Sequence, residues 1–121
     1  MNFDEAQYGN AIVLYPEGRL DQDTAAAFQE RLLEAVGSGN EAVIVDFSKI
    51  PYISSVGLRA IMIAAKQSKS DGVSLSVADL TDTVREIFEI SRFSFVVTIH
   101  ESLRDAVAAV SSEALSAFEG S

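Results

Sequence analysis

The chain has 121 residues, of which 48% are apolar, and it contains no Cys, one His and no Trp. A globular chain of this length forms one domain around a single hydrophobic core and needs neither disulfides nor a metal to fold. Its 18 acidic and 9 basic residues give a formal net charge of −9, which disfavours binding to nucleic acid and to anionic membranes. With no Cys and only His100, thiol chemistry and the common zinc sites are excluded.

The first residues and the hydropathy pattern indicate a cytoplasmic protein. The segment Met1–Glu5 is acidic, whereas a signal peptide begins with basic residues. No apolar run approaches the ~20 residues that a membrane-spanning helix needs. We therefore expect a soluble, cytoplasmic domain that has no membrane partner.

The first half of the chain predicts two strands, a helix and a third strand. The apolar run at 11–15 ends in a Pro-Glu-Gly turn, and residues 3–8 are expected to pair with it as an edge strand. From Thr24 the apolar residues recur at helical spacing, with Asp23 or Thr24 as the cap and a Gly-Ser-Gly sequence as the stop. The apolar segment 42–47 is typical of a strand buried on both faces.

The second half continues this alternation. A second helix is expected from about residue 56 to 70, and it is followed by a strand at 73–77. The predicted core face of that helix comprises Leu58, Ile61, Met62 and Ala65. Thr83 and Glu86 match the capping box T-x-x-E, which predicts a third helix running through Ile90.

The chain is expected to finish with a strand at 95–99 and a last core helix at 102–110. Alternating strands and helices predict a single α/β domain with a mixed, mostly parallel sheet and about four helices. We assign residues 1–110 to this domain. Residues 111–121 are expected to be a C-terminal extension that either prolongs the last helix or frays.

Signatures of nucleotide and hydrolase chemistry are missing from the sequence. Neither a Walker A motif nor a GxGxxG motif occurs, and Gly37-Ser38-Gly39 ends a predicted helix rather than opening one. A Ser-His-Asp triad would depend on His100, at a junction where a lone His is usually a cap or a solvated residue. The acidic pairs Asp21/Asp23 and Asp79/Asp82 flank helix starts, where the helix dipole favours carboxylates.

The receiver domains of response regulators are also acidic α/β domains of about this length. Asp46 could correspond to the Asp that accepts the phosphoryl group in a receiver. However, a receiver needs two adjacent acids after its first strand to hold magnesium, and Tyr15-Pro16-Glu17 offers no such pair. A receiver also needs a Lys on its last strand, and no Lys follows Lys69. We therefore expect no enzyme activity, no cofactor and no metal site.

One segment carries a distinctive pattern. Residues 45–59 lead from the buried strand through a short loop into a helix whose first turn holds two serines and a glycine. Judged from local chemistry alone, Ser54 or Ser55 is the N-cap of that helix, because a serine hydroxyl can accept a hydrogen bond from a free backbone N–H.

The same segment resembles the STAS domain family, and within it the stand-alone anti-sigma factor antagonists of bacteria. The shared pattern is a strand ending Asp46-Phe47-Ser48, a loop Ile50-Pro51-Tyr52-Ile53, and Ser54-Ser55-Val56-Gly57-Leu58 at the start of a helix. The resemblance extends over nearly the whole chain, including Gly18-Arg19-Leu20-Asp21 and residues 102–107.

The resemblance implies that Ser55 is a regulatory phosphorylation site. In that family a serine kinase of the histidine-kinase-like ATPase type, acting as anti-sigma factor, phosphorylates this position, and a PP2C-type phosphatase restores it. The unphosphorylated form binds the kinase and so regulates transcription indirectly. The family usually has Asp before the phosphorylated serine, whereas this chain has Ser54, which is therefore a competing acceptor.

The second helix is also the expected binding surface. If its core face is as predicted, Arg59, Ile63 and Lys66 point outward, and an apolar side chain ringed by charge is typical of a protein interface. The resemblance places the partner near this helix and the Arg19–Asp21 loop. The expected partner-binding residues are Arg19, Asp21, Val56, Arg59, Ile63 and Lys66.

A second hypothesis assigns the domain to a different class of protein. It would be an unswitched STAS subunit of a lipid-transport ATPase or a scaffold of a sensor complex, and its serines would only cap the helix. The two hypotheses differ in whether a hydroxyl at the helix start is accessible to a kinase.

Overall fold

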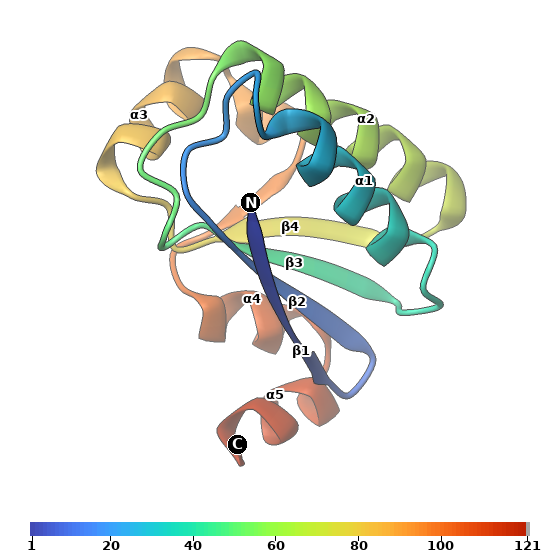
Figure 1. Cartoon of the computed structure of the whole chain (residues 1–121). Coiled ribbons are helices and arrows are strands. Elements are labelled where there is room, and N and C mark those ends of the chain that lie inside the picture. Colours follow the sequence, from blue (N-terminus) through green and yellow to red (C-terminus); the bar gives the residue numbers. More distant parts are fainter. Residues whose placement is uncertain (121) are drawn as a thin grey trace.

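The computed structural model describes residues 1–120, which build a five-stranded sheet with helices on both faces (Figure 1). The strands lie in the order in which they occur in the chain: β1 (Asn2–Tyr8), β2 (Ala11–Glu17), β3 (Ala42–Asp46), β4 (Ser74–Ala78) and β5 (Thr98–His100). The first pair is antiparallel and the other three pairs are parallel. The predicted α/β class and the mixed, mostly parallel sheet are confirmed.

The helices divide between the two faces of the sheet. One face is covered by α1 (Ala25–Val36), α2 (Ser55–Asp71) and α3 (Asp82–Ile90). The other is covered by α4 (Leu103–Val110) and α5 (Ser112–Glu119), as Figure 1 shows. A single 3₁₀ turn, η1 (Phe93–Phe95), joins α3 to the last strand.

The core has two layers because side chains of β3 alternate between the two faces. Val43 and Val45 join the larger apolar cluster, while Ala42 and Ile44 join the smaller one on the α4 side. A chain of aromatic contacts crosses the larger layer, with centroid distances of 6.3 Å for Phe28–Phe47, 5.9 Å for Phe47–Phe88 and 5.0 Å for Phe88–Phe93. β3 is therefore buried on both faces, as its sequence predicts.

The predicted core face of α2 is wrong at one position. Ile61 and Ala65 are buried and Leu58 is partly buried, but the Met62 side chain is 49% exposed. The buried stripe is centred instead on Ala60 and Ala64, whose small side chains face the core. The helix is thus rotated relative to the prediction, and Met62 lies on its outer surface.

The predicted cap of α3 and the predicted last strand are also wrong. α3 begins at Asp82 after Thr81, whose hydroxyl donates to the carbonyl of Ile50 (2.9 Å), so Thr83 and Glu86 form no capping box. The strand expected at 95–99 is reduced to Thr98–His100 because the chain first turns through η1. That turn buries Phe93 against Phe88 and leaves Phe95 81% exposed.

The C-terminal residues form a separate helix. Ser111 is extended (φ −171°, ψ 160°) and so ends α4, and its hydroxyl accepts a hydrogen bond from the Ala114 N–H (3.0 Å) to begin α5. Tyr8 and Phe118 meet edge to face at 5.1 Å, so α5 is a helix of its own that packs beside β1 and does not continue α4. The division into a domain at 1–110 and an extension at 111–121 stays a prediction, and Ser121 lies outside the described residues.

No helix within residues 1–120 is both long enough and apolar enough to cross a membrane.

Candidate functional site

Two loops meet at the carboxyl ends of β2 and β3. The Gly18 N–H donates to the carbonyl of Lys49 (3.1 Å), and the Leu20 N–H donates to the carbonyl of Tyr52 (2.9 Å). The Ser54 N–H then donates to the carbonyl of Leu20 (2.8 Å). These bonds tie the 18–24 loop to the segment that starts α2, so Arg19 and Asp21 lie beside the two serines.

Gly57 allows α2 to approach these loops closely. A Cβ at this position would lie 2.7 Å from Ile53 Cγ1 and 3.2 Å from both the Cβ and the carbonyl oxygen of Leu20. Leu20 and Ile53 are themselves fully buried. The first turn of α2 therefore packs tightly against buried apolar side chains. This packing fixes the positions of the side chains on the exposed side of the turn.

Ser54 is the N-cap of α2. Its backbone is extended (φ −90°, ψ 173°) and its hydroxyl accepts a hydrogen bond from the Gly57 N–H (3.3 Å). The sequence allows either Ser54 or Ser55 to be the N-cap, and the structure shows that it is Ser54. Serine is among the residues that cap helices best, so Ser54 fills this role without a carboxylate.

Ser55 is the first residue of α2 and is exposed. Its hydroxyl makes no hydrogen bond with any other group in residues 1–120. The two adjacent serines therefore differ. The hydroxyl of Ser54 is hydrogen-bonded to the backbone of α2, and the hydroxyl of Ser55 faces solvent.

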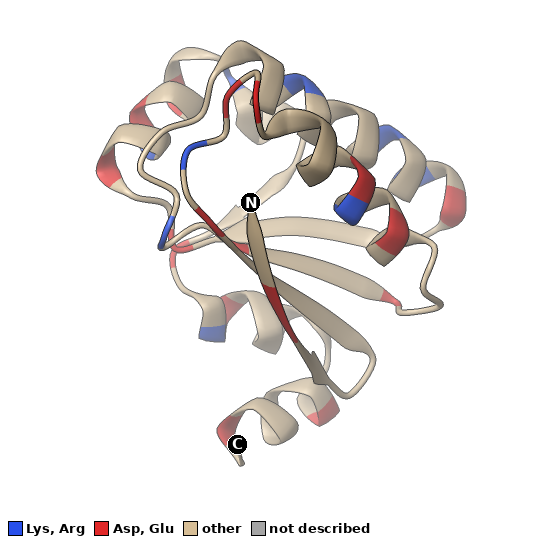
Figure 2. Ribbon diagram, in the orientation of Figure 1, with Lys and Arg blue, Asp and Glu red and all other residues tan. Residues whose placement is uncertain are grey.

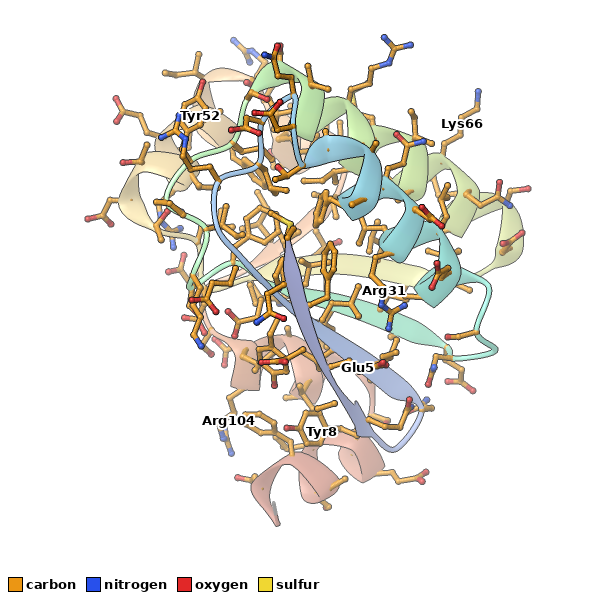
Figure 3. All side chains as sticks on the ribbon, viewed as in Figure 1. Glu5, Tyr8, Arg31, Tyr52, Lys66 and Arg104 are labelled. Atoms are coloured by element: carbon orange, nitrogen blue, oxygen red, sulfur yellow. The ribbon has the colours of Figure 1, made fainter. Side chains whose placement is uncertain are left out.

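The outer face of α2 is basic on a chain that is strongly acidic. Arg59, Lys66 and Lys69 are exposed, and none of them forms an ion pair with another of the described residues. Figure 2 shows that Lys and Arg, in blue, recur along α2, and Figure 3 shows Lys66 pointing away from the sheet. By contrast, Arg31, Arg85 and Arg104 are paired with Glu5, Glu101 and Glu119.

Apolar side chains lie among these bases. Val56 is 45% and Ile63 is 37% exposed, and the prediction that Arg59, Ile63 and Lys66 point outward is confirmed. The sequence did not identify Met62 as part of this surface, because its helical spacing fits the core face equally well. It also did not identify Tyr52, whose ring lies 4.5 Å from the Arg19 guanidinium carbon.

Three acidic residues that could suggest a catalytic site accept hydrogen bonds from backbone N–H groups instead. Asp21 Oδ1 accepts from the Asp23 N–H (3.0 Å), and Asp79 Oδ2 accepts from the Leu103 N–H at the start of α4 (3.1 Å). Buried Asp46 accepts from the Ser48 N–H (2.8 Å) and turns the chain after β3. No group of three or more potential metal-ligating side chains occurs among the residues that the structure describes.

One phenol has a perturbed pKa, away from the serines. Burial raises the pKa of Tyr15 well above its usual value, and neighbouring Tyr8 and the charge of Asp46 raise it further. Tyr15 packs with the smaller apolar cluster on the α4 side of the sheet. This phenol therefore stays neutral at physiological pH and takes no part in the surface formed by α2.

Comparison with known proteins gives a consistent result. The sequence model of the STAS domain family matches residues 2–106. BtrV of Bordetella bronchiseptica, named as a candidate anti-sigma factor antagonist, is 34% identical over 99 residues, which cover 82% of this chain and 84% of BtrV. RsfB of Mycobacterium tuberculosis, named as an anti-sigma-F factor antagonist, is 27% identical over 105 residues, which cover 87% of this chain and 85% of RsfB.

Solved structures show the same fold. The anti-sigma factor antagonist SpoIIAA in its unphosphorylated form superposes with a TM-score of 0.74 at 15% identity, over 90% of this chain and 96% of SpoIIAA. The phosphorylated form of SpoIIAA, from Bacillus, superposes with a TM-score of 0.68 at 14% identity, over 91% of this chain and all of that one.

The division of roles between the serines predicts different effects on stability. Ser54→Ala removes the cap and should lower the free energy of unfolding by about 1 kcal/mol. Ser55→Ala removes a hydroxyl that has no partner in the described structure and should change it by less than about 0.5 kcal/mol. Urea denaturation of both variants measures the difference, and equal losses would contradict this assignment of the cap.

The close packing of Gly57 predicts a second difference. Alanine normally favours a helix over glycine, but Gly57→Ala should lower the free energy of unfolding by about 1–3 kcal/mol because its Cβ overlaps Ile53. The control is Gly37→Ala, where φ is −84° and the new Cβ would make only ordinary contacts, so stability should be kept or slightly raised. Thermal melts in which the two variants behave alike would show that the contact is not tight.

Proposed function

This chain is a member of the STAS domain family, and we propose that it is an anti-sigma factor antagonist whose binding is switched by phosphorylation of Ser55. The names of BtrV and RsfB support the antagonist function. The existence of SpoIIAA in two phosphorylation states supports the switch. The observation that carries the proposal is the exposed, unbonded hydroxyl of Ser55 next to the cap.

The proposed partner is an anti-sigma factor that is also a serine kinase of the histidine-kinase-like ATPase type. The unphosphorylated antagonist binds this kinase, which frees the sigma factor and so regulates transcription indirectly. A PP2C-type phosphatase returns the phosphorylated antagonist to its binding form. The antagonist itself acts by binding and not by catalysis, and it contacts neither nucleic acid nor membrane.

The position of Ser55 explains why phosphorylation would change binding and not folding. A phosphate adds about −1.5 to −2 charge, and the positive end of the helix dipole tolerates that charge at the first residue of α2. The cap is made by Ser54 and is untouched by modification of Ser55. The fold therefore persists while the charge of the exposed surface is altered.

The surface around Ser55 suggests the chemistry of the partner. The proposed contact residues are Arg19, Asp21, Val56, Arg59, Ile63 and Lys66. The unpaired bases on α2 favour an acidic partner surface around an apolar contact to Val56 and Ile63. A phosphate on Ser55 would meet that acidic surface directly, where like charges cost several kcal/mol and lower the affinity by orders of magnitude.

Ser54 is the weaker of the two candidate acceptors. Its hydroxyl is partly buried and already accepts from Gly57, so phosphorylation there would sacrifice the cap. Phosphorylation of Ser55 leaves the cap intact, and we therefore assign the switch to Ser55.

Labelling with ATP tests the acceptor. Incubation with a histidine-kinase-like anti-sigma factor from the same organism should label the wild type and Ser54→Ala, assayed below its melting temperature, but not Ser55→Ala. No label should appear without the kinase, because the chain has no nucleotide-binding motif. Label retained in Ser55→Ala would refute the assignment, and a wild type that no such kinase labels would favour the unswitched module.

Binding measurements test the surface. Ile63→Asp, Arg59→Glu and the phosphate mimic Ser55→Asp should each weaken binding to that kinase by about tenfold or more, with unchanged melting transitions. Ile90→Asp is the control because Ile90 is an even more exposed isoleucine, at 76%, but lies on α3. If Ile63→Asp and Arg59→Glu bind like the wild type, the interface is elsewhere.

A further inference from the structure

A groove lies between the second half of α2 and η1. It has a volume of about 290 Å³ and is lined by Met62, Ala65, Lys66, Lys69, Phe95 and Val96. An adjoining hollow of about 280 Å³ shares Ala65, Lys69, Phe95 and Val96 and reaches the start of β4. Because the two hollows share these four lining residues, we refer to them together as the α2–η1 groove.

The groove exists because β5 is short. β5 pairs only with Ser76, Val77 and Ala78 of β4, so the first two residues of β4 have no strand beside them on that side. The chain that would have filled this position curls into η1 instead. The same curl turns Phe95 outward, and its side chain forms one wall of the groove.

The groove displays apolar surface that nothing in residues 1–120 covers. Phe95 is 81% exposed and Met62 is 49% exposed. Backbone hydrogen bonds hold the turn that carries Phe95. The Phe95 N–H donates to the carbonyl of Arg92 (3.2 Å), and the Val97 N–H donates to the carbonyl of Phe93 (3.1 Å). A large aromatic side chain held in water at a groove wall is typical of a protein contact.

The groove is aligned with the phosphorylation site. Ser55, Arg59, Met62, Lys66 and Lys69 follow one another at spacings of four, three, four and three residues. Such spacing places them along one stripe of a helix. At 1.5 Å per residue, Lys69 lies only about 21 Å from Ser55 along the axis, which is within the span of one ordinary protein interface.

The charges on this stripe restrict what can occupy the groove. Lys66 and Lys69 line it and have no acidic partner among the described residues, so a complementary occupant carries acidic groups. A second copy of this chain, seated by two-fold symmetry on the groove, would bring the lysines of both copies together, which is repulsive. The charge pattern therefore favours a different protein.

We propose that the anti-sigma factor bound at Ser55 also inserts an apolar side chain, flanked by acidic residues, into the α2–η1 groove. This inference rests on the proposed function and extends its interface along α2. Phe95 and Met62 form a second anchor, and Lys66 and Lys69 pair with the acidic residues. Because this anchor is remote from Ser55, substitutions at the two ends should act independently, and their fold-changes in affinity should multiply.

Calorimetric titration with the histidine-kinase-like anti-sigma factors of the same organism tests the proposal. Phe95→Ser should weaken binding by about tenfold or more, whereas the control Ile90→Ser, at a residue of similar exposure on α3, should change it less than about twofold. Met62→Gln is a second groove variant, on a different element, in case Phe95→Ser lowers the melting temperature. Lys66→Gln with Lys69→Gln should weaken binding and reduce its dependence on salt.

The outcomes separate this inference from the proposed function. If Ser55→Asp and Arg59→Glu weaken binding but Phe95→Ser and Met62→Gln do not, the groove is no part of the interface and the proposed function stands. If the wild type binds no such anti-sigma factor, the proposed function itself fails. Sedimentation tests the remaining alternative. If the wild type forms dimers that Phe95→Ser abolishes, and if this substitution leaves binding to the anti-sigma factor unchanged, the groove binds a second copy of the chain.

Discussion

The close approach of α2 to the Leu20 segment is the constraint on which the functional surface depends. Gly57 has no Cβ, so the first turn of the helix rests directly on Ile53 and on the Leu20 backbone. The hydrogen bond from Ser54 N–H to Leu20 completes this contact. Two loops that are far apart in the sequence are thereby joined, and the residues they present keep fixed positions relative to Ser55.

In the function we propose, this arrangement assigns folding and regulation to two adjacent residues. Ser54 uses its hydroxyl to cap the helix, while Ser55 keeps its hydroxyl in solvent. A charge added to Ser55 therefore acts on whatever binds the exposed face of α2. In the function we propose, the unpaired bases along that face make the effect large, because they favour an acidic partner that a phosphate would repel.

Much of this could be predicted from the sequence, because strong periodicity and glycine-rich turns determine the elements and the sheet. The wrong predictions share a physical cause. A local pattern does not specify how a helix is rotated about its axis, nor which contacts with distant residues replace the local ones. Met62 fits a core stripe by spacing, but alanines occupy that stripe. Thr83 fits a capping box, but the hydroxyl of Thr81 bonds to Ile50 across the fold. Residues 95–99 fit a strand, but burying Phe93 against Phe88 turns the chain away.

The central claim is that Ser55 carries a reversible phosphate in the cell. Intact-mass measurement of the protein purified from its native cells, before and after phosphatase treatment, tests it most directly. We expect a population heavier by one phosphate group, which fragmentation places on Ser55 and which phosphatase removes. A phosphate on any other residue, or a protein that is unmodified under every growth condition, would contradict it.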